Sequence, residues 1–215
     1  MTRKNPMTDL ALVAVFAALI AAVTAWVPGI AIPGSSVPIT LQTLVIGLTA
    51  MILGAWRAFA ATALYLLVGF AGLPVFAEGA SGLGVLSKPS AGYLLSFPLY
   101  ALLVGALAQW VLRRGLGVAV VGLVVAGLVG SALTVHPMGI VGLVQNLGVS
   151  FSKGLAIDML YWPGDLIKTI VAALVAVAVH KAFPALLHRS ARHEVPTAQH
   201  VDEPATGGGA TAPRR

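Results

Sequence analysis

The chain has 215 residues, of which 58% are hydrophobic and only 9% are charged, and its mean hydropathy is +0.94. Soluble domains carry about 25% charged residues, so this composition excludes a water-soluble globular protein and predicts an all-α integral membrane protein. The sequence has no cysteine, which excludes disulfides, thiolate catalysis and cysteine-based metal sites. The net charge of +6 comes from basic residues scattered over short loops and tails, which suits membrane orientation better than nucleic-acid binding.

Six apolar stretches, separated by charged or Gly/Pro-rich segments, are each near the roughly 20 residues that cross a bilayer, although the second is short. They cover residues 8–27, 38–53, 58–73, 89–112, 115–135 and 163–183. The first stretch lacks a convincing cleavage site, so we expect a spanning helix there and not a signal peptide. The sequence thus predicts a six-transmembrane-helix bundle formed by residues 1–183.

Small residues follow one face of the first helix. Ala14, Ala18 and Ala22 are spaced by four, which lets another helix of this chain or of a partner pack closely. The second helix opens with the segment VPITLQTL, residues 37–44. Its Gln42 can both donate and accept hydrogen bonds, which suits an amide-like or urea-like ligand. Hydrogen bonding between helices is the alternative role for this side chain.

The segment GLPVFAEGASGLGVLS, residues 72–87, is rich in glycine, so its backbone can approach a ligand closely or move as a lid. Its Phe76 is suited to cover an apolar ring. Ser90, Gly92 and Tyr93 follow at the start of the fourth helix. A tyrosine at such a helix end suits either the wall of a ligand site or the membrane interface.

Residues 136–162 allow two interpretations. The stretch is moderately apolar but contains polar residues, among them Gln145, Asn146, Lys153 and Asp158. This mixture favours an amphipathic segment at the membrane interface. A seventh spanning helix is the competing interpretation.

The segment YWPGDLIK, residues 161–168, opens the last span. Pro163 suits the first turn of a helix, because its missing N–H needs no partner there. Asp165 then lies where the helix dipole favours a carboxylate, and Lys168 follows on the same side of the helix. The two residues are either a local ion pair or ligand anchors, since Asp accepts hydrogen bonds from N–H groups and Lys pairs with carboxylates.

Basic residues predict the orientation. With six spans, ten of the 13 Lys and Arg residues fall on the side of the two termini and three on the other side. The positive-inside rule therefore puts both termini in the cytoplasm. The polar, low-complexity residues 184–215 are then a disordered cytoplasmic tail. The three long loops face outward, which predicts a ligand pocket on the extracellular side.

Enzyme motifs are missing from the sequence. It contains no G-x-x-x-x-G-K-[ST], H-E-x-x-H or G-x-S-x-G pattern, so we expect no enzymatic activity. A small integral membrane enzyme acting on lipid remains the alternative, with Asp165 and Lys168 as its one candidate pair.

Four segments in this order, VPITLQTL, GLPVFAEGASGLGVL, KPSAGYLLSF and YWPGDLIK, resemble the BioY family, the biotin-binding S components of energy-coupling-factor (ECF) transporters. The resemblance extends from about residue 10 to residue 180. It implies a multi-pass protein of the bacterial cytoplasmic membrane that captures biotin outside and delivers it inward. The sequence departs from the family pattern in places: Lys88 adds a cation at the pocket mouth, Ala91 replaces a glycine, and Glu78 adds an acid. Residues 136–162 match the pattern poorly.

The resemblance also implies roles for particular residues. Asp165 would accept hydrogen bonds from the ureido N–H groups of biotin, and Lys168 would pair with Asp165 or with the ligand carboxylate. The remaining residues of the expected biotin site are Gln42, Phe76, Ser90, Gly92 and Tyr93. The face of Ala14, Ala18 and Ala22 would contact a transmembrane coupling subunit, which works with two ATPase subunits. Biotin is the transported ligand, no cofactor or metal is expected, and an S component for another small vitamin is the alternative.

Overall fold

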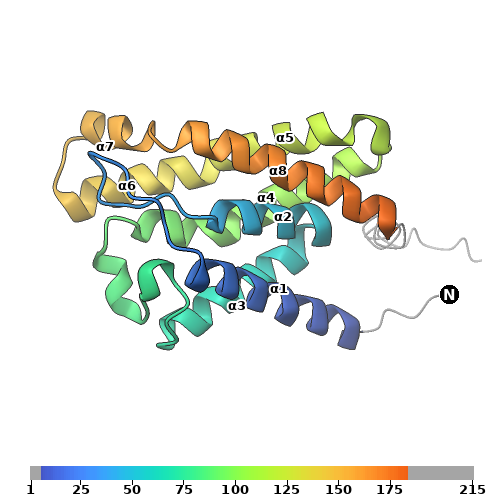
Figure 1. Ribbon diagram of the computed structural model, residues 1–215, viewed down its shortest axis with the longest axis horizontal. Coiled ribbons are helices and arrows are strands. Elements are labelled where there is room, and N and C mark those ends of the chain that lie inside the picture. Colours follow the sequence, from blue (N-terminus) through green and yellow to red (C-terminus); the bar gives the residue numbers. More distant parts are fainter. Residues whose placement is uncertain (1–5, 184–215) are drawn as a thin grey trace, which may run out of the picture.

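The computed structural model describes residues 6–183, which form a bundle of helices that run along one long axis (Figure 1). The tail predicted for residues 184–215 lies outside the described residues. The α-helices are α1 (Pro6–Trp26), α2 (Gln42–Leu53), α3 (Ala55–Phe70), α4 (Ala91–Leu112), α5 (Ala119–Gly130), α6 (His136–Leu147), α7 (Phe151–Asp158) and α8 (Trp162–Ala182). The shorter turns are the 3₁₀ helices η1 (Ala77–Gly79), η2 (Leu83–Ser87) and η3 (Leu116–Val118), and the π-helical turn η4 (Ser131–Val135).

Within residues 6–183, four helices are long and apolar enough to cross a membrane, namely α1, α4, the continuous helix Leu116–Leu147, and α8. The predicted first, fourth and sixth spans begin and end within two residues of α1, α4 and α8. α2 and α3 are shorter apolar helices, joined at Gly54. Gly54 has a φ of +79°, which glycine adopts without strain, and a side chain there would run into Gln109 of α4.

The fifth helix is longer than predicted. Residues 136–162 were expected to form an interfacial segment or a seventh span. This expectation is wrong for residues 136–147, because α5 continues through η4 into α6 as one helix. Pro137 lacks an N–H, and its ring crowds the carbonyl four residues earlier. The wider π turn directly before it lets the helix pass this residue without ending. Residues 151–158 form the separate short helix α7, which Ser150 caps at its N-terminus.

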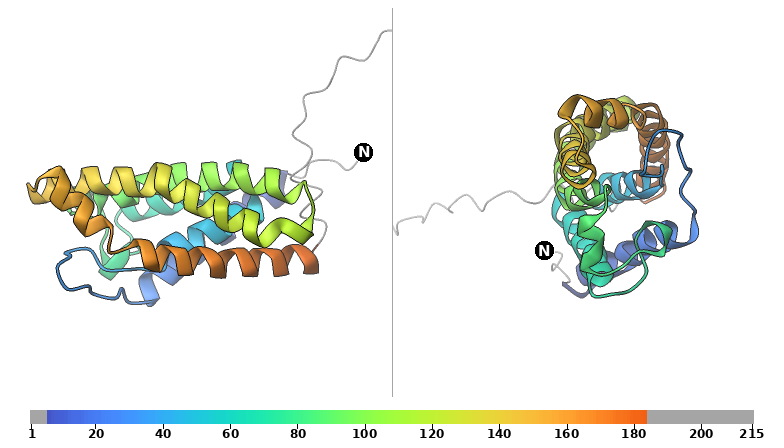
Figure 2. Two further views of the ribbon diagram at one scale, coloured as in Figure 1. Left: turned by 90° about the horizontal axis from the view of Figure 1, so that it is seen from above. Right: turned by 90° about the vertical axis from the view of Figure 1, so that its left-hand side faces the viewer.

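α2 and α4 lie at the centre of the bundle. α2 packs against α1, α3, α4 and α8, and α4 packs against α2, α3, α5 and α6. α1 lies at the edge, where it contacts mainly α3 and α2, as the end-on view in Figure 2 shows. Ala17 and Ile20 of α1 are buried against its neighbours, whereas Ala14 and Ala18 are exposed and Ala22 is half-buried.

The two ends of the bundle differ. The start of α1 and the end of α8 lie at one end, where Arg57 of α3 pairs with Asp9 of α1 at 3.0 Å (Figures 1 and 2). At this end His180 of α8 hydrogen-bonds the carbonyl of Met51 at 2.9 Å and so ties α8 to the last turn of α2. The opposite end, called the loop end below, holds the segments 27–41 and 71–90 together with α7.

The shortness of α2 makes room at the loop end. α2 has 12 residues, whereas α4 has 22 and α8 has 21. At 1.5 Å per residue, α2 is about 18 Å long, roughly half the length of its two neighbours. Since α2 is short and ends at the Gly54 turn, its first residues lie inside the bundle and do not reach the loop end. The segment 27–41 leads down to them and is folded back on itself by paired hydrogen bonds between Ile30 and Ile39.

Candidate functional site

A cavity lies between the start of α2 and the loop end of the bundle. Its empty volume, including the part open to solvent, is about 920 Å³, which lies in the range of about 300–1,000 Å³ found for small-molecule sites. Apolar side chains form much of its wall, including Ile39, Val85, Leu94, Phe97 and Val135. The predicted site residues that line it are Gln42, Phe76, Ser90, Tyr93, Asp165 and Lys168.

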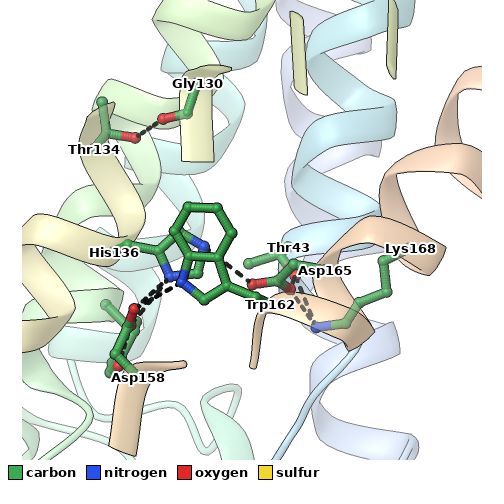
Figure 3. A network of polar contacts seen from close by, with 9 residues as sticks. Thr43, Gly130, Thr134, His136, Asp158, Trp162, Asp165 and Lys168 are labelled. Atoms are coloured by element: carbon green, nitrogen blue, oxygen red, sulfur yellow. Dashed lines mark hydrogen bonds and ion pairs between the residues drawn. The ribbon is translucent and has the colours of Figure 1, made fainter. Parts of the chain in front are cut away.

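Asp165 stands on the first turn of α8 and is 6% exposed. Its Oδ1 accepts hydrogen bonds from Lys168 Nζ at 2.7 Å and from Thr43 Oγ1 of α2 at 3.0 Å (Figure 3). Lys168 Nζ also donates to Thr43 Oγ1 at 3.0 Å, which directs the Thr43 hydrogen toward Asp165. The local pair seen in the sequence is therefore one part of a triangle that joins two helices.

The two carboxylate oxygens of Asp165 have different surroundings. Oδ1 is occupied by the two donors of the triangle, whereas none of the residues between 6 and 183 donates a hydrogen bond to Oδ2. Nε2 of His136 lies 3.8 Å from Oδ2. A buried carboxylate oxygen retains strong acceptor capacity, so Oδ2 is available to a ligand N–H.

Gln42 is already engaged by its neighbours. Its Nε2 donates to Tyr65 Oη at 2.9 Å, and its Oε1 accepts from Thr40 Oγ1 at 2.9 Å. Tyr65 in turn donates to the carbonyl of Val75 at 3.2 Å. Gln42 therefore ties the start of α2 to α3 and to the segment 71–90, and keeps one amide hydrogen for other partners.

Phe76 is packed into the cavity wall and is 2% exposed. Its ring meets those of Tyr65 and Phe70 edge to face, with centroids 5.6 and 5.4 Å away. Gly69 of α3 makes this position possible, because a Cβ atom there would overlap the Phe76 ring. The aromatic cluster fixes one apolar side of the cavity.

Tyr93 and Gly92 are neighbours on α4 but face different ways. Tyr93 lines the cavity, and its hydroxyl donates to Asp158 Oδ1 at 2.8 Å. Gly92 does not line the cavity and lies where α4 meets α6. A Cβ at Gly92 would overlap the carbonyl oxygen of Met138 and lie 3.0 Å from the amide nitrogen of Gly142.

Tyr161 holds the segment 27–41 over the cavity. Its hydroxyl donates to the carbonyl of Val37 at 2.8 Å and forms a hydrogen bond with the hydroxyl of Ser35. Burial raises the pKa of the Tyr161 phenol above its ordinary value, so the group stays a neutral donor at physiological pH. Sequence reasoning did not assign Tyr161 a role, since its partners come from more than 120 residues away.

A second polar group lies behind the cavity wall and was missed as well. Asp158, at the end of α7, is fully buried and is contacted by His136 of α6 and by Trp162 Nε1 at 3.1 Å. The available signal was a carboxylate and an imidazole within a largely apolar stretch, since such groups in membrane proteins usually face a partner or a functional cavity.

Comparisons with known proteins agree with the fold. Residues 1–185 match the family model of BioY. The chain is 35% identical over 184 residues to the biotin transporter BioY of Rhizobium etli, covering 85% of this chain and 98% of that protein. It is 36% identical over 184 residues to the biotin transporter BioY of Thermotoga maritima, covering 81% of this chain and 97% of that protein.

A solved structure shares the fold. It is described as the S-component for biotin from an ECF-type ABC transporter, and it matches with a TM-score of 0.77 and 25% sequence identity. The match covers 84% of this chain and 95% of that one.

Proposed function

The chain belongs to the BioY family, and we propose that the cavity at its loop end is the site where it holds biotin. The protein serves biotin uptake as the substrate-binding component of an ECF-type transporter. It is a multi-pass protein of the bacterial membrane and not an enzyme. The observation that carries the assignment of the site is a buried carboxylate with one free oxygen, set in a largely apolar cavity.

Biotin combines a fused apolar ring system, a urea edge and a carboxylate tail. Asp165 Oδ2 accepts a hydrogen bond from the ureido N–H, while Lys168 and Thr43 hold the other oxygen and fix the orientation of the carboxylate. Lys168 thus acts as the partner of Asp165, because its ammonium already lies 2.7 Å from Oδ1. Phe76 and Tyr93 supply apolar surface for the rings.

The mouth of the cavity supports a second contact. Lys88 lies on the rim and is exposed, and no acidic group within residues 6–183 forms an ion pair with it. The carboxylate tail of biotin, pointing outward from the urea anchor, meets this ammonium. Because the site is exposed to solvent, the contribution of Lys88 to affinity is modest and falls with added salt.

The topology follows from the same assignment. Six spans are formed by α1, α2, α3, α4, the continuous α5–α6 helix and α8, with the short helix α2 at the centre and the short helix α3 packed on α1, α2 and α4. The positive-inside rule then places both termini in the cytoplasm and the cavity on the extracellular side.

The partner of the chain is an ECF module. A transmembrane coupling subunit packs against the face of Ala14, Ala18 and Ala22, and two ATPase subunits drive transport. The support for this face is that Ala14 and Ala18 are exposed on an edge helix. Small side chains there let a second helix approach closely.

The test is equilibrium binding of labelled biotin to the purified protein, beside Asp165→Ala and the control Asp9→Ala. Asp9 is a partly exposed carboxylate that pairs with Arg57 outside the cavity. We expect saturable one-to-one binding by the wild type and by the Asp9 variant. For Asp165→Ala we expect a loss of roughly 100-fold or more, because the change removes the ligand acceptor and leaves the half-buried Lys168 ammonium without a counter-charge. Tight binding of another vitamin but not of biotin, by a monodisperse wild type, would overturn the assignment.

A further inference from the structure

His136 lies between two buried carboxylates (Figure 3). It is the first residue of α6, directly after the π turn η4, and it is 4% exposed. Its Nδ1 is 2.9 Å from Asp158 Oδ2 and 3.0 Å from Asp158 Oδ1. Its Nε2 faces the other way and is 3.8 Å from Asp165 Oδ2, the oxygen proposed to accept the ureido N–H of biotin.

The groups around the Asp158 carboxylate include two hydrogen-bond donors and the His136 imidazole. The indole N–H of Trp162 can only donate, and it points at Oδ2 at 3.1 Å. The hydroxyl of Tyr93 donates to Oδ1 at 2.8 Å, and Nδ1 of His136 lies within hydrogen-bond distance of both oxygens. A carboxylate surrounded by donors on both oxygens is stabilised as the anion.

The charges of the groups around His136 do not cancel. Asp158 and Asp165 contribute two negative charges, and Lys168 contributes one positive charge. A net negative charge buried in a membrane protein is costly, whereas an imidazolium at His136 makes the cluster neutral. A neutral imidazole has one N–H, so it would turn a lone pair toward one of the two carboxylates.

An aromatic ring supports the cationic form. The indole of Trp162 stacks on the imidazole, with ring centroids 4.3 Å apart and planes 14° from parallel. The face of an indole attracts a cation placed over it. The same residue therefore holds Asp158 through its N–H and covers the imidazole with its ring.

The groups that face the cluster come from several elements. α4 contributes Tyr93, and α7 contributes Asp158. α8 contributes Asp165 and Lys168, and the turn before it contributes Tyr161, whose ring packs on Tyr93. η4, which leads directly into α6, and α5 before it carry no Asp, Glu, Lys, Arg, His or Tyr.

We propose that His136 is a positioning residue for biotin binding, acting as a doubly protonated imidazolium that links buried Asp158 to the ligand-binding carboxylate of Asp165. The proposal rests on the assignment of Asp165 as the biotin anchor. Loss of the proton as pH rises leaves the cluster with a net negative charge. It also removes the positive charge that faces Asp165 Oδ2. Biotin itself carries a carboxylate, so its binding weakens with rising pH.

The first experiment measures the dissociation constant of biotin between about pH 5.5 and pH 9, the range in which histidines titrate. The variants are His136→Gln and the control His180→Gln, which removes another buried histidine at the opposite end of the bundle. We expect wild type and the His180 variant to bind more weakly as pH rises. His136→Gln binds roughly 10- to 100-fold more weakly at low pH and loses the pH dependence.

The second experiment reads the protonation of His136 directly and does not depend on any variant folding. Nitrogen NMR of the wild type with labelled histidine, assigned with His136→Gln or His136→Asn, shows two protonated ring nitrogens at neutral pH. A single protonated nitrogen, or a His136→Gln variant with wild-type affinity and pH profile, overturns the proposal. Absence of biotin binding by the wild type would instead refute the proposed function, and the NMR result would still stand.

Discussion

Replacement of Gly92 by alanine separates two roles that this residue could have. Sequence reasoning placed Gly92 in the biotin site, whereas the structure places it in the contact between α4 and α6. The added Cβ would overlap the carbonyl oxygen of Met138, and it would also lie 2.8 Å from the carbonyl carbon of that residue. Both are backbone atoms, which cannot rotate away as a side chain does.

The cost follows from this geometry. Ordinary contacts of a Cβ begin near 3.4 Å, so α4 and α6 must move apart along their closest approach. Overpacking of this kind destabilises proteins by about 1–3 kcal/mol, and the rigid neighbour argues for the upper part of that range. For a chain of this size, about 2–3 kcal/mol corresponds to a decrease of roughly 4–12 °C in the melting temperature.

The assay is thermal unfolding in detergent, followed by tryptophan fluorescence and by size-exclusion chromatography after heating. Gly117→Ala is the matched control, because a Cβ at Gly117 meets no atom within 4 Å. We expect the control to melt like the wild type. If Gly92→Ala is as stable as Gly117→Ala but binds biotin poorly, the packing argument is refuted and Gly92 is a ligand contact.

Three further substitutions test other parts of the structure. Gly69→Ala should displace the buried Phe76 ring, lowering stability by about 1–3 kcal/mol and weakening biotin binding; unchanged melting would show that the ring has room to shift. Thr43→Val should weaken biotin binding roughly three- to tenfold by removing one hydrogen bond from the anchor triangle, and equal affinity in a titration would contradict its orienting role. Arg57→Gln should lower stability by no more than about 1 kcal/mol, since its ion pair with Asp9 is partly exposed; a larger loss in chemical unfolding would reveal a structural role.

The spanning helices were predictable because membrane crossing imposes a simple pattern. Long apolar runs bounded by charges or prolines set the limits of α1, α4 and α8 to within two residues. The fifth helix was cut short in the prediction because His136 and Pro137 look like a helix boundary. The π turn that carries the helix through them packs against α4, a tertiary contact that a local pattern does not encode.

Some contacts of the site could be predicted from the sequence, and others could not. Asp165 and Lys168 lie one helical turn apart, so their contact follows from helix geometry and was visible in the sequence. The contact between His136 and Asp158 joins α6 to α7 across 22 residues of sequence. Tyr93, the second partner of Asp158, lies 65 residues from it in the sequence. Such contacts are set by tertiary packing, and periodicity or spacing carries no signal for them.

The length of the α5–α6 helix has a consequence for the surrounding lipid. Its 32 apolar-rich residues extend about 48 Å, while the hydrocarbon layer of a bilayer is about 30 Å thick and α2 reaches only about 18 Å. Such hydrophobic mismatch is relieved by helix tilt or by local thinning and thickening of the bilayer, each at a modest energetic cost. α2 carries Thr43 in the cavity wall, and α6 carries His136 directly behind that wall. We therefore expect a change in acyl-chain length to shift these two helices relative to each other. Biotin affinity is then expected to vary with the acyl-chain length of the surrounding lipid.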